Sequence, residues 1–168
     1  MLKRLCGSWL LAVVAFALVT GCASIPGPIP RMDAAKRTYD AGFDKAWEAV
    51  NDVVAEKRLP IKTLEKESGL LATDVVSSGS RHVFYGRTEN GRQLSEWADK
   101  TRYFLNIRVR RLNDSQTQID VLAHMEFMRY EYNAALNRSV AVGWDACESH
   151  GDIERELYEA IAKKLGTR

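Results

Sequence analysis

Near the C-terminus of the chain, four consecutive residues carry side chains that could do chemistry together. They are Cys147, Glu148, Ser149 and His150. If Cys147 lies beside the start of a helix, the positive end of that helix and the nearby imidazole would lower the pKa of its thiol and make it a nucleophile or a redox-sensitive group. Glu148 opposes this effect, and no third group in view would orient a base. We therefore expect a half-buried structural cysteine rather than a reactive one.

The histidines of the chain do not have the spacing of a metal site. His82, His124 and His150 fall on three different predicted elements, and none has a second histidine, a glutamate or a pair of cysteines at the distance typical of a metal motif. The sequence also lacks the Gly-x-Ser-x-Gly elbow of hydrolases, a phosphate-binding loop and a dinucleotide fingerprint. We therefore expect a protein that is not an enzyme and needs no metal and no cofactor.

A second reactive position lies near the N-terminus. Lys3 and Arg4 precede an apolar run from Trp9 to Val19, which leads into Thr20-Gly21-Cys22. A positive start, an apolar core of about ten residues and small residues before a cut site are typical of a secretory signal, and the run is too short to span a bilayer as a mature helix. An ordinary membrane anchor or a buried helix is the disfavoured alternative, because no stop-transfer flank follows.

The end of this segment resembles the lipobox of bacterial lipoproteins. Val19-Thr20-Gly21 fill the positions before the cut, and Cys22 fills the position of lipid attachment. The resemblance implies a signal peptide over residues 1–21, a diacylglyceryl group on the Cys22 thiol and, as a rule, an acylated new N-terminus. Two or three acyl chains hold a protein stably on a membrane. Ala23 stands where an aspartate tends to retain such lipoproteins at the inner membrane, which implies the periplasmic face of the outer membrane.

Removal of the leader makes the chain neutral. The full chain has 24 Lys and Arg against 22 Asp and Glu, and two of the bases, Lys3 and Arg4, lie in the leader together with Cys6. A neutral protein has no net electrostatic reason to bind nucleic acid. Because Cys22 is expected to carry lipid, Cys147 is the only free thiol expected in the mature chain, and no internal disulfide is expected.

The remaining sequence predicts a linker and one domain. Residues 22–35 hold the lipidated cysteine and three prolines and predict an extended linker, with a packed arm after Met32 as the alternative. Residues 36–168 have the length of a single domain. The predicted elements in this domain are an edge strand over 36–41, a helix between Gly42 and Pro60, a hairpin of strands 61–66 and 70–76, a second hairpin of strands 102–110 and 119–127, and a terminal helix with an apolar stripe from Ile153 to Leu165.

Two segments and the start of the terminal helix have less regular patterns. Residues 81–100 are polar and irregular, with a possible strand over 81–85. Residues 129–142 suit either a continuing strand or a loop with some helix. Ser149 to Asp152 have the Ser-x-x-acid form of a capping box for the terminal helix. The order β-α-β-β-β-β-α predicts an α+β fold, a two-layer antiparallel sheet of four to five strands with two helices on one face.

The first part of this domain resembles a known family. Residues 39–47, the helix that follows them, Ile61 on a strand and residues 69–73 on the next strand are similar to the helix-grip domains of BamC-like periplasmic lipoproteins. The resemblance covers residues 36–76 and the terminal helix. It implies a helix-grip arrangement and an accessory role in outer-membrane protein assembly. BamC carries two such domains, whereas this chain has room for one.

The sequence leaves two binding functions open. One is a non-enzymatic accessory or scaffold lipoprotein of the envelope that binds another protein, and the other is a carrier of lipid or a small apolar ligand in the groove between the sheet and the terminal helix. The candidate binding surface consists of large aromatic residues that do not belong to the apolar faces of the predicted helices and strands. These residues are Phe84, Tyr85, Trp97, Tyr130, Tyr132 and Trp144. Aromatic residues are enriched at interface hot spots, although these rings could instead cap the open end of the sheet.

A row of arginines on the second hairpin suggests an anion-binding stripe. The row comprises Arg108, Arg110 and Arg111. Because Asp114, Asp120 and Glu126 are close in the predicted hairpin, we expect an ordinary solvated sheet face with cross-strand ion pairs instead.

Overall fold

The computed structural model of the chain describes residues 36–87 and 93–167. The predicted signal peptide over 1–21, the lipid attachment site Cys22 and the predicted linker therefore lie outside the described residues. The described residues form nine elements, which are β1 (Arg37–Tyr39), α2 (Phe43–Glu56), β2 (Ile61–Glu65), β3 (Leu70–Thr73), β4 (Val76–Arg87), β5 (Gln93–Arg111), β6 (Thr117–Asn133), β7 (Arg138–Cys147) and α3 (Asp152–Leu165).

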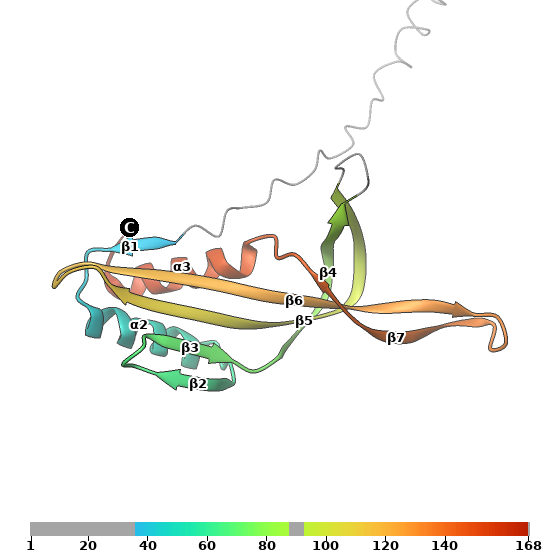
Figure 1. Ribbon diagram of the computed structural model, residues 1–168, viewed down its shortest axis with the longest axis horizontal. Coiled ribbons are helices and arrows are strands. Elements are labelled where there is room, and N and C mark those ends of the chain that lie inside the picture. The colour runs from blue at the N-terminus through green and yellow to red at the C-terminus, as the bar shows by residue number, and fades with distance from the viewer. Residues whose placement is uncertain (1–35, 88–92, 168) are drawn as a thin grey trace, which may run out of the picture. The chain divides into compact units, whose positions relative to one another are not determined.

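The strands form one antiparallel sheet with two long strands at its centre. Five strands follow one another in the order β1-β6-β5-β3-β2, while β4 pairs with β5 and β7 pairs with β6 further along the same two strands. Because β5 and β6 are longer than their neighbours, each has a different partner on its outer edge at its two ends (Figure 1). The sheet therefore has a central part and two hairpins that continue from it, the β4–β5 hairpin and the β6–β7 hairpin.

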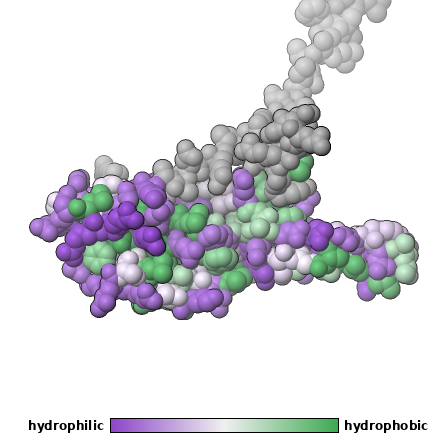
Figure 2. Space-filling view, viewed as in Figure 1, coloured by the Kyte–Doolittle hydropathy of each residue, from purple (hydrophilic) through white to green (hydrophobic). Residues whose placement is uncertain are grey.

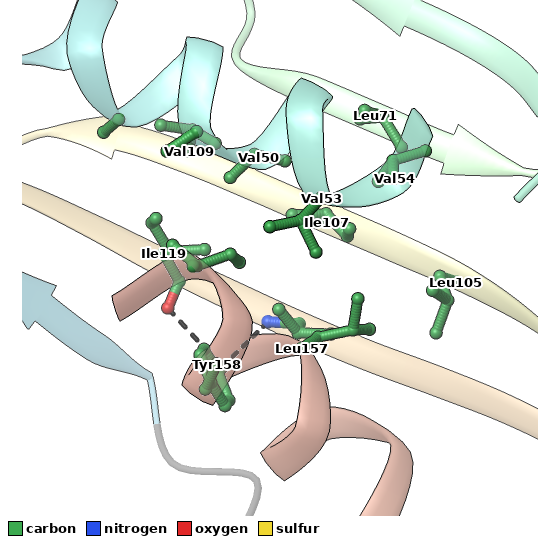
Figure 3. Packing of buried hydrophobic residues seen from close by; sticks show 14 of the residues in the cluster. Val50, Val53, Val54, Leu71, Leu105, Ile107, Val109, Ile119, Leu157 and Tyr158 are labelled. Atoms are coloured by element: carbon green, nitrogen blue, oxygen red, sulfur yellow. Dashed lines mark hydrogen bonds between the residues drawn. The ribbon is translucent and has the colours of Figure 1, made fainter. Parts of the chain in front are cut away.

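Both helices cover the same face of the sheet. Alternate residues of β5 and β6, such as Leu105, Ile107 and Val121, are fully buried, as expected when side chains on one face of a sheet pack against helices. They form one cluster with Val50 of α2 and Leu157 of α3, and the residues labelled in Figure 3 show this packing. The opposite face of the sheet, called the open face below, bears the intervening residues of β5 and β6.

The α+β class and the two helices agree with the prediction, but the sheet is larger than expected. It has seven strands, not four to five. The segment 81–100 was predicted to be irregular apart from a possible strand over 81–85. That strand is confirmed as part of β4, whereas the irregular structure predicted for the rest was wrong, because its described residues belong to β4 and β5. The segment 129–142, which the sequence left between strand and loop, forms the end of β6, a turn and part of β7.

The predicted capping box is also wrong. The N-cap of α3 is Gly151, in the left-handed conformation with φ 84°, and no side chain caps the helix. Ser149 Oγ instead accepts a hydrogen bond from the Gly151 N–H at 3.0 Å and donates one to Glu154 Oε2 at 2.6 Å. Asp152 forms an ion pair with Arg81 of β4 rather than capping the backbone. The serine is thus engaged by a buried carboxylate one turn further into the helix.

Candidate functional site

The thiol of Cys147 lies in an apolar environment. It is half-buried, as expected, and packs against both hydrophobic clusters of the domain. Burial, and then the negative charge of Glu126, raise the pKa of Cys147 to about 11. His150 does not act on the thiol through a hydrogen bond, because its Nε2 lies 3.0 Å from the backbone oxygen of His82. The surroundings therefore suppress the thiolate form instead of activating it.

His150 belongs to a contact between β4 and the connection from β7 to α3. Its ring lies 4.0 Å from that of Phe84 and 5.9 Å from that of His82, measured between centroids. The Glu148 N–H donates to the Phe84 oxygen at 2.8 Å. Burial is the main cause that lowers the pKa of His150. Phe84 is therefore a packing residue, only 7% exposed, and the prediction that it lies on a binding surface is wrong.

Two buried polar side chains of α3 complete an edge of β6. On the edge of β6 that faces away from β5, no described strand pairs with β6 between its pairing with β1 and its pairing with β7. There the Val121 N–H donates to the hydroxyl of Tyr158 at 2.9 Å, and the Ala123 N–H donates to Glu154 Oε1 at 3.2 Å. Both side chains are 2% exposed. Since a buried unpaired N–H is costly, these residues substitute for the missing strand.

A hollow of about 400 Å³ lies beside this edge, at the N-terminal end of α3. Its walls include Phe104, Leu122 and Met125 together with the carboxylates Glu126, Glu148 and Glu154. Over the ranges that the structure describes, no three histidine, cysteine or acidic side chains converge as metal ligands. The apolar residues of α3 that face the sheet are buried in the core, so this hollow is not the continuous apolar groove that a carrier was expected to have.

The predicted aromatic surface is divided between two hairpins. Trp97 lies on the β4–β5 hairpin and is 66% exposed, whereas Tyr130 and Tyr132 lie on the β6–β7 hairpin and are 40% and 66% exposed. Figure 1 shows the two hairpins leaving the central sheet in different directions. The side chain of Tyr85 lies outside the described part of the structure. The predicted residues therefore do not form one continuous patch.

Trp144 is held against the open face of the sheet. The guanidinium of Arg102 lies 4.1 Å from the centroid of its ring and also forms an ion pair with Glu126. Trp144 is half-buried there. Its role in the structure is to fasten the base of the β6–β7 hairpin through a cation–π contact.

The β6–β7 hairpin carries further exposed apolar residues outside the candidate binding surface. Leu136, in the turn, is 54% exposed, and Val142, on β7, is 42% exposed. Figure 2 shows hydrophobic residues along this hairpin among hydrophilic ones. A local signal existed, because residues 129–142 held more apolar residues than a free loop needs. Only the pairing of β6 with β7 shows that they lie on a hairpin with water on both faces.

No protein-family model and no curated protein matches this chain. A crystal structure of a DUF4468 family protein from Bacteroides ovatus aligns with a TM-score of 0.43 at 9% identity, covering 85% of this chain and 93% of that chain. The Zhui aromatase/cyclase from Streptomyces sp. R1128 aligns with a TM-score of 0.24 at 16% identity, covering 79% and 84%. Among the helices of the described residues, none has the length and apolar character to cross a membrane.

Proposed function

We propose that the chain is a lipoprotein, anchored through Cys22 at the periplasmic face of the outer membrane, that acts as a non-enzymatic accessory or scaffold of the envelope. The observation that carries the protein-binding part is the exposed aromatic surface of the β6–β7 hairpin. The anchor is supported by the lipobox-like sequence that ends at Cys22.

The pairing of the hairpin explains why its tyrosines stay exposed. Tyr130 and Tyr132 are two residues apart on β6, so their side chains leave the same face. Their partners on β7 are the small residues Ala141 and Ser139, which cannot cover the rings. Exposed tyrosines on a strand supply a large contact area, and tyrosine is enriched at interface hot spots.

The backbone of the hairpin offers a second means of binding. β7 pairs with β6 on one side, and the bridge between Phe84 and Glu148 adjoins the end of the strand. Beside residues 138–146 the described structure places no further strand. An isolated two-stranded ribbon is marginally stable, and an open strand edge can pair with an extended segment of another protein. A partner strand on β7 would both satisfy this edge and cover the apolar residues.

The alternative function, a carrier of lipid or a small apolar ligand, has weaker support. The hollow at the N-terminal end of α3 contains Glu126, Glu148 and Glu154. An apolar ligand there would lie against charged carboxylate groups to which it can donate no hydrogen bond, so these walls suit it poorly. Co-purification of a bound lipid with the folded protein would favour the carrier.

The anchor is tested with Cys22→Ser in the full chain. We expect that the signal peptide of this variant is not cleaved and that the chain incorporates no labelled acyl groups. The variant should then be missing from the lipid-modified membrane fraction in which the native protein is found. A variant that is still cleaved and acylated would contradict the anchor.

Protein binding is tested by placing a photocrosslinking residue at Tyr132 in cells, with one at exposed Lys45 of α2 as the matched control. We expect a discrete crosslinked envelope protein from position 132 and not from position 45. Tyr130→Ala should reduce its yield. An equal pattern from both positions, or none from 132, would contradict docking through the hairpin.

A further inference from the structure

The open face of the sheet carries a group of cations at the end of β5. Arg108 and Arg110 alternate with the buried Ile107 and Val109, so both side chains leave the open face, and both are exposed. Lys36, just before β1, reaches the same face, because its Nζ lies 3.4 Å from Asp120 of β6. We refer to Lys36, Arg108 and Arg110 as the basic strip.

The basic strip is not neutralised by the ion pairs expected from the sequence. Such a pair exists further along the hairpin, where Arg102 faces Glu126. The cross-strand partner of Arg108 is Asp120, which is engaged by Lys36, and the partner of Arg110 is the uncharged Gln118. No carboxylate of the described residues lies within ion-pair distance of Arg108 or Arg110. Three cations therefore share one carboxylate.

Two depressions of the surface adjoin these arginines. A small one lies between Arg108, Arg110, Lys36 and Asp120. A larger one, of about 410 Å³, is bounded by the same two arginines, by Arg111 and Phe43, and by the turn at residues 67–69, which includes the acid Glu67. Hydrophilic residues gather at this end of the sheet in Figure 2. The space is large enough for a phosphate-bearing headgroup, and guanidinium groups bind phosphate with two parallel hydrogen bonds.

We propose that the basic strip binds the headgroups of anionic phospholipids and so lays the open face of the sheet against the membrane that holds the lipid anchor. The part about the anchor rests on the proposed function. Charge complementarity favours an anionic surface, and the chain enters the domain at Lys36, directly after the predicted linker of residues 23–35. Arg108 and Arg110 are exposed on a sheet face, where they can reach the headgroups of a lipid surface.

A lipid anchor makes a weak headgroup contact sufficient. Once Cys22 is inserted in a leaflet, the strip meets that leaflet at the high effective concentration that a short linker provides. The two or three acyl chains expected on Cys22 already hold a protein stably on a membrane. The strip would therefore set the orientation of the domain on the membrane rather than decide whether it is attached.

The test uses unlipidated protein, so that it does not depend on the anchor. The core residues that the structure describes lie between Tyr39 and Leu165 in one compact unit, so a chain of residues 23–168 keeps all of them. We expect it to sediment with phosphatidylcholine vesicles that contain phosphatidylglycerol, and to be released by high salt. Arg108→Gln with Arg110→Gln should weaken this binding about 25-fold, at about fivefold for each charge near the surface. Arg138→Gln, an exposed arginine of β7, is the control and should change little.

Four outcomes would overturn the proposal. The first three are equal binding to pure phosphatidylcholine vesicles, equal binding by the double variant and the Arg138→Gln control, and displacement by inorganic phosphate at constant ionic strength. The third would show a small-anion site. In the fourth outcome, the chain sediments with none of the vesicles but binds an acidic peptide through the strip. The strip would then be a protein interface, and the membrane assignment would be wrong. None of these results bears on Cys22 acylation or on crosslinking from Tyr132, so a failure here is distinguishable from a failure of the proposed function.

Discussion

At the scale of single residues, the chemistry suggested by the sequence depends on burial, which a local pattern does not contain. Cys147, Ser149 and His150 are adjacent in the chain, yet the histidine bonds to β4 and the serine to Glu154. Their side chains contact different partners because the chain passes here from the end of β7 to the start of α3. The half-buried position expected for Cys147 is confirmed, but the sequence had no means of predicting that Glu126 would add its charge to the cost of ionising this thiol.

We predict that Cys147 reacts slowly with maleimide in the folded protein. A pKa of about 11 against an ordinary value of 9.0 leaves about a hundredfold less thiolate near neutral pH. The labelling rate should keep rising above pH 9, while the free energy of unfolding falls, because the unfolded chain ionises first. The comparison is Ser139→Cys in a Cys147→Ser background of residues 23–168, at an exposed position. Equal rates for the two thiols at neutral pH would refute the prediction.

Gly69 offers a second residue-scale prediction. It has φ 65°, and a Cβ on it would lie 1.9 Å from the backbone oxygen of Val109. Gly79 has φ 70° and open space around it, so it isolates the cost of the left-handed conformation. We expect Gly79→Ala to cost about 1–2 kcal/mol and Gly69→Ala about 1–3 kcal/mol more, measured by urea unfolding. Similar losses for both variants would mean that the turn at residues 67–69 can move away from β5.

At the scale of elements, strands were predicted well wherever one face is buried. Residues 102–110 and 119–127 alternate apolar and polar side chains because helices cover one side of them, and this hairpin is confirmed. Residues 81–100 show no such alternation. Their strands form through pairing between β4 and β5, with three register shifts, beyond the cover of the helices. A local sequence pattern does not show such pairing between strands, so the predicted number of strands in the sheet was too small.

The edge of β6 between β1 and β7 gives the element-scale prediction. Tyr158→Phe removes the hydroxyl that accepts the Val121 N–H and leaves this buried group without its partner. We expect a loss of about 1–3 kcal/mol in the free energy of unfolding. Tyr132→Phe, which removes an exposed hydroxyl bonded to Asn137, is the control and should cost less than about 0.5 kcal/mol. Equal effects would show that water or a shift of α3 can satisfy the β6 edge.

At the scale of the whole domain, the two proposed surfaces lie at opposite ends of one strand. Gln118, beside the basic strip, and Tyr132, on the β6–β7 hairpin, are both in β6. At about 3.3 Å per residue they are about 45 Å apart along that strand. No sequence pattern shows this, because it follows from β6 being long enough to pair with β1 at one end and with β7 at the other.

This separation predicts that the two surfaces act independently. Arg108→Gln with Arg110→Gln should weaken vesicle binding and leave the yield of the crosslink from position 132 unchanged. Tyr130→Ala should do the reverse, and a chain with all three substitutions should show both losses with no extra effect, because sites this far apart with no shared partner add. The measurement is vesicle sedimentation and crosslink yield for each chain. If loss of the basic strip also lowers the crosslink yield of the unlipidated chain in solution, the surfaces are coupled. Such coupling would mean that the separation along β6 does not isolate the two surfaces from each other.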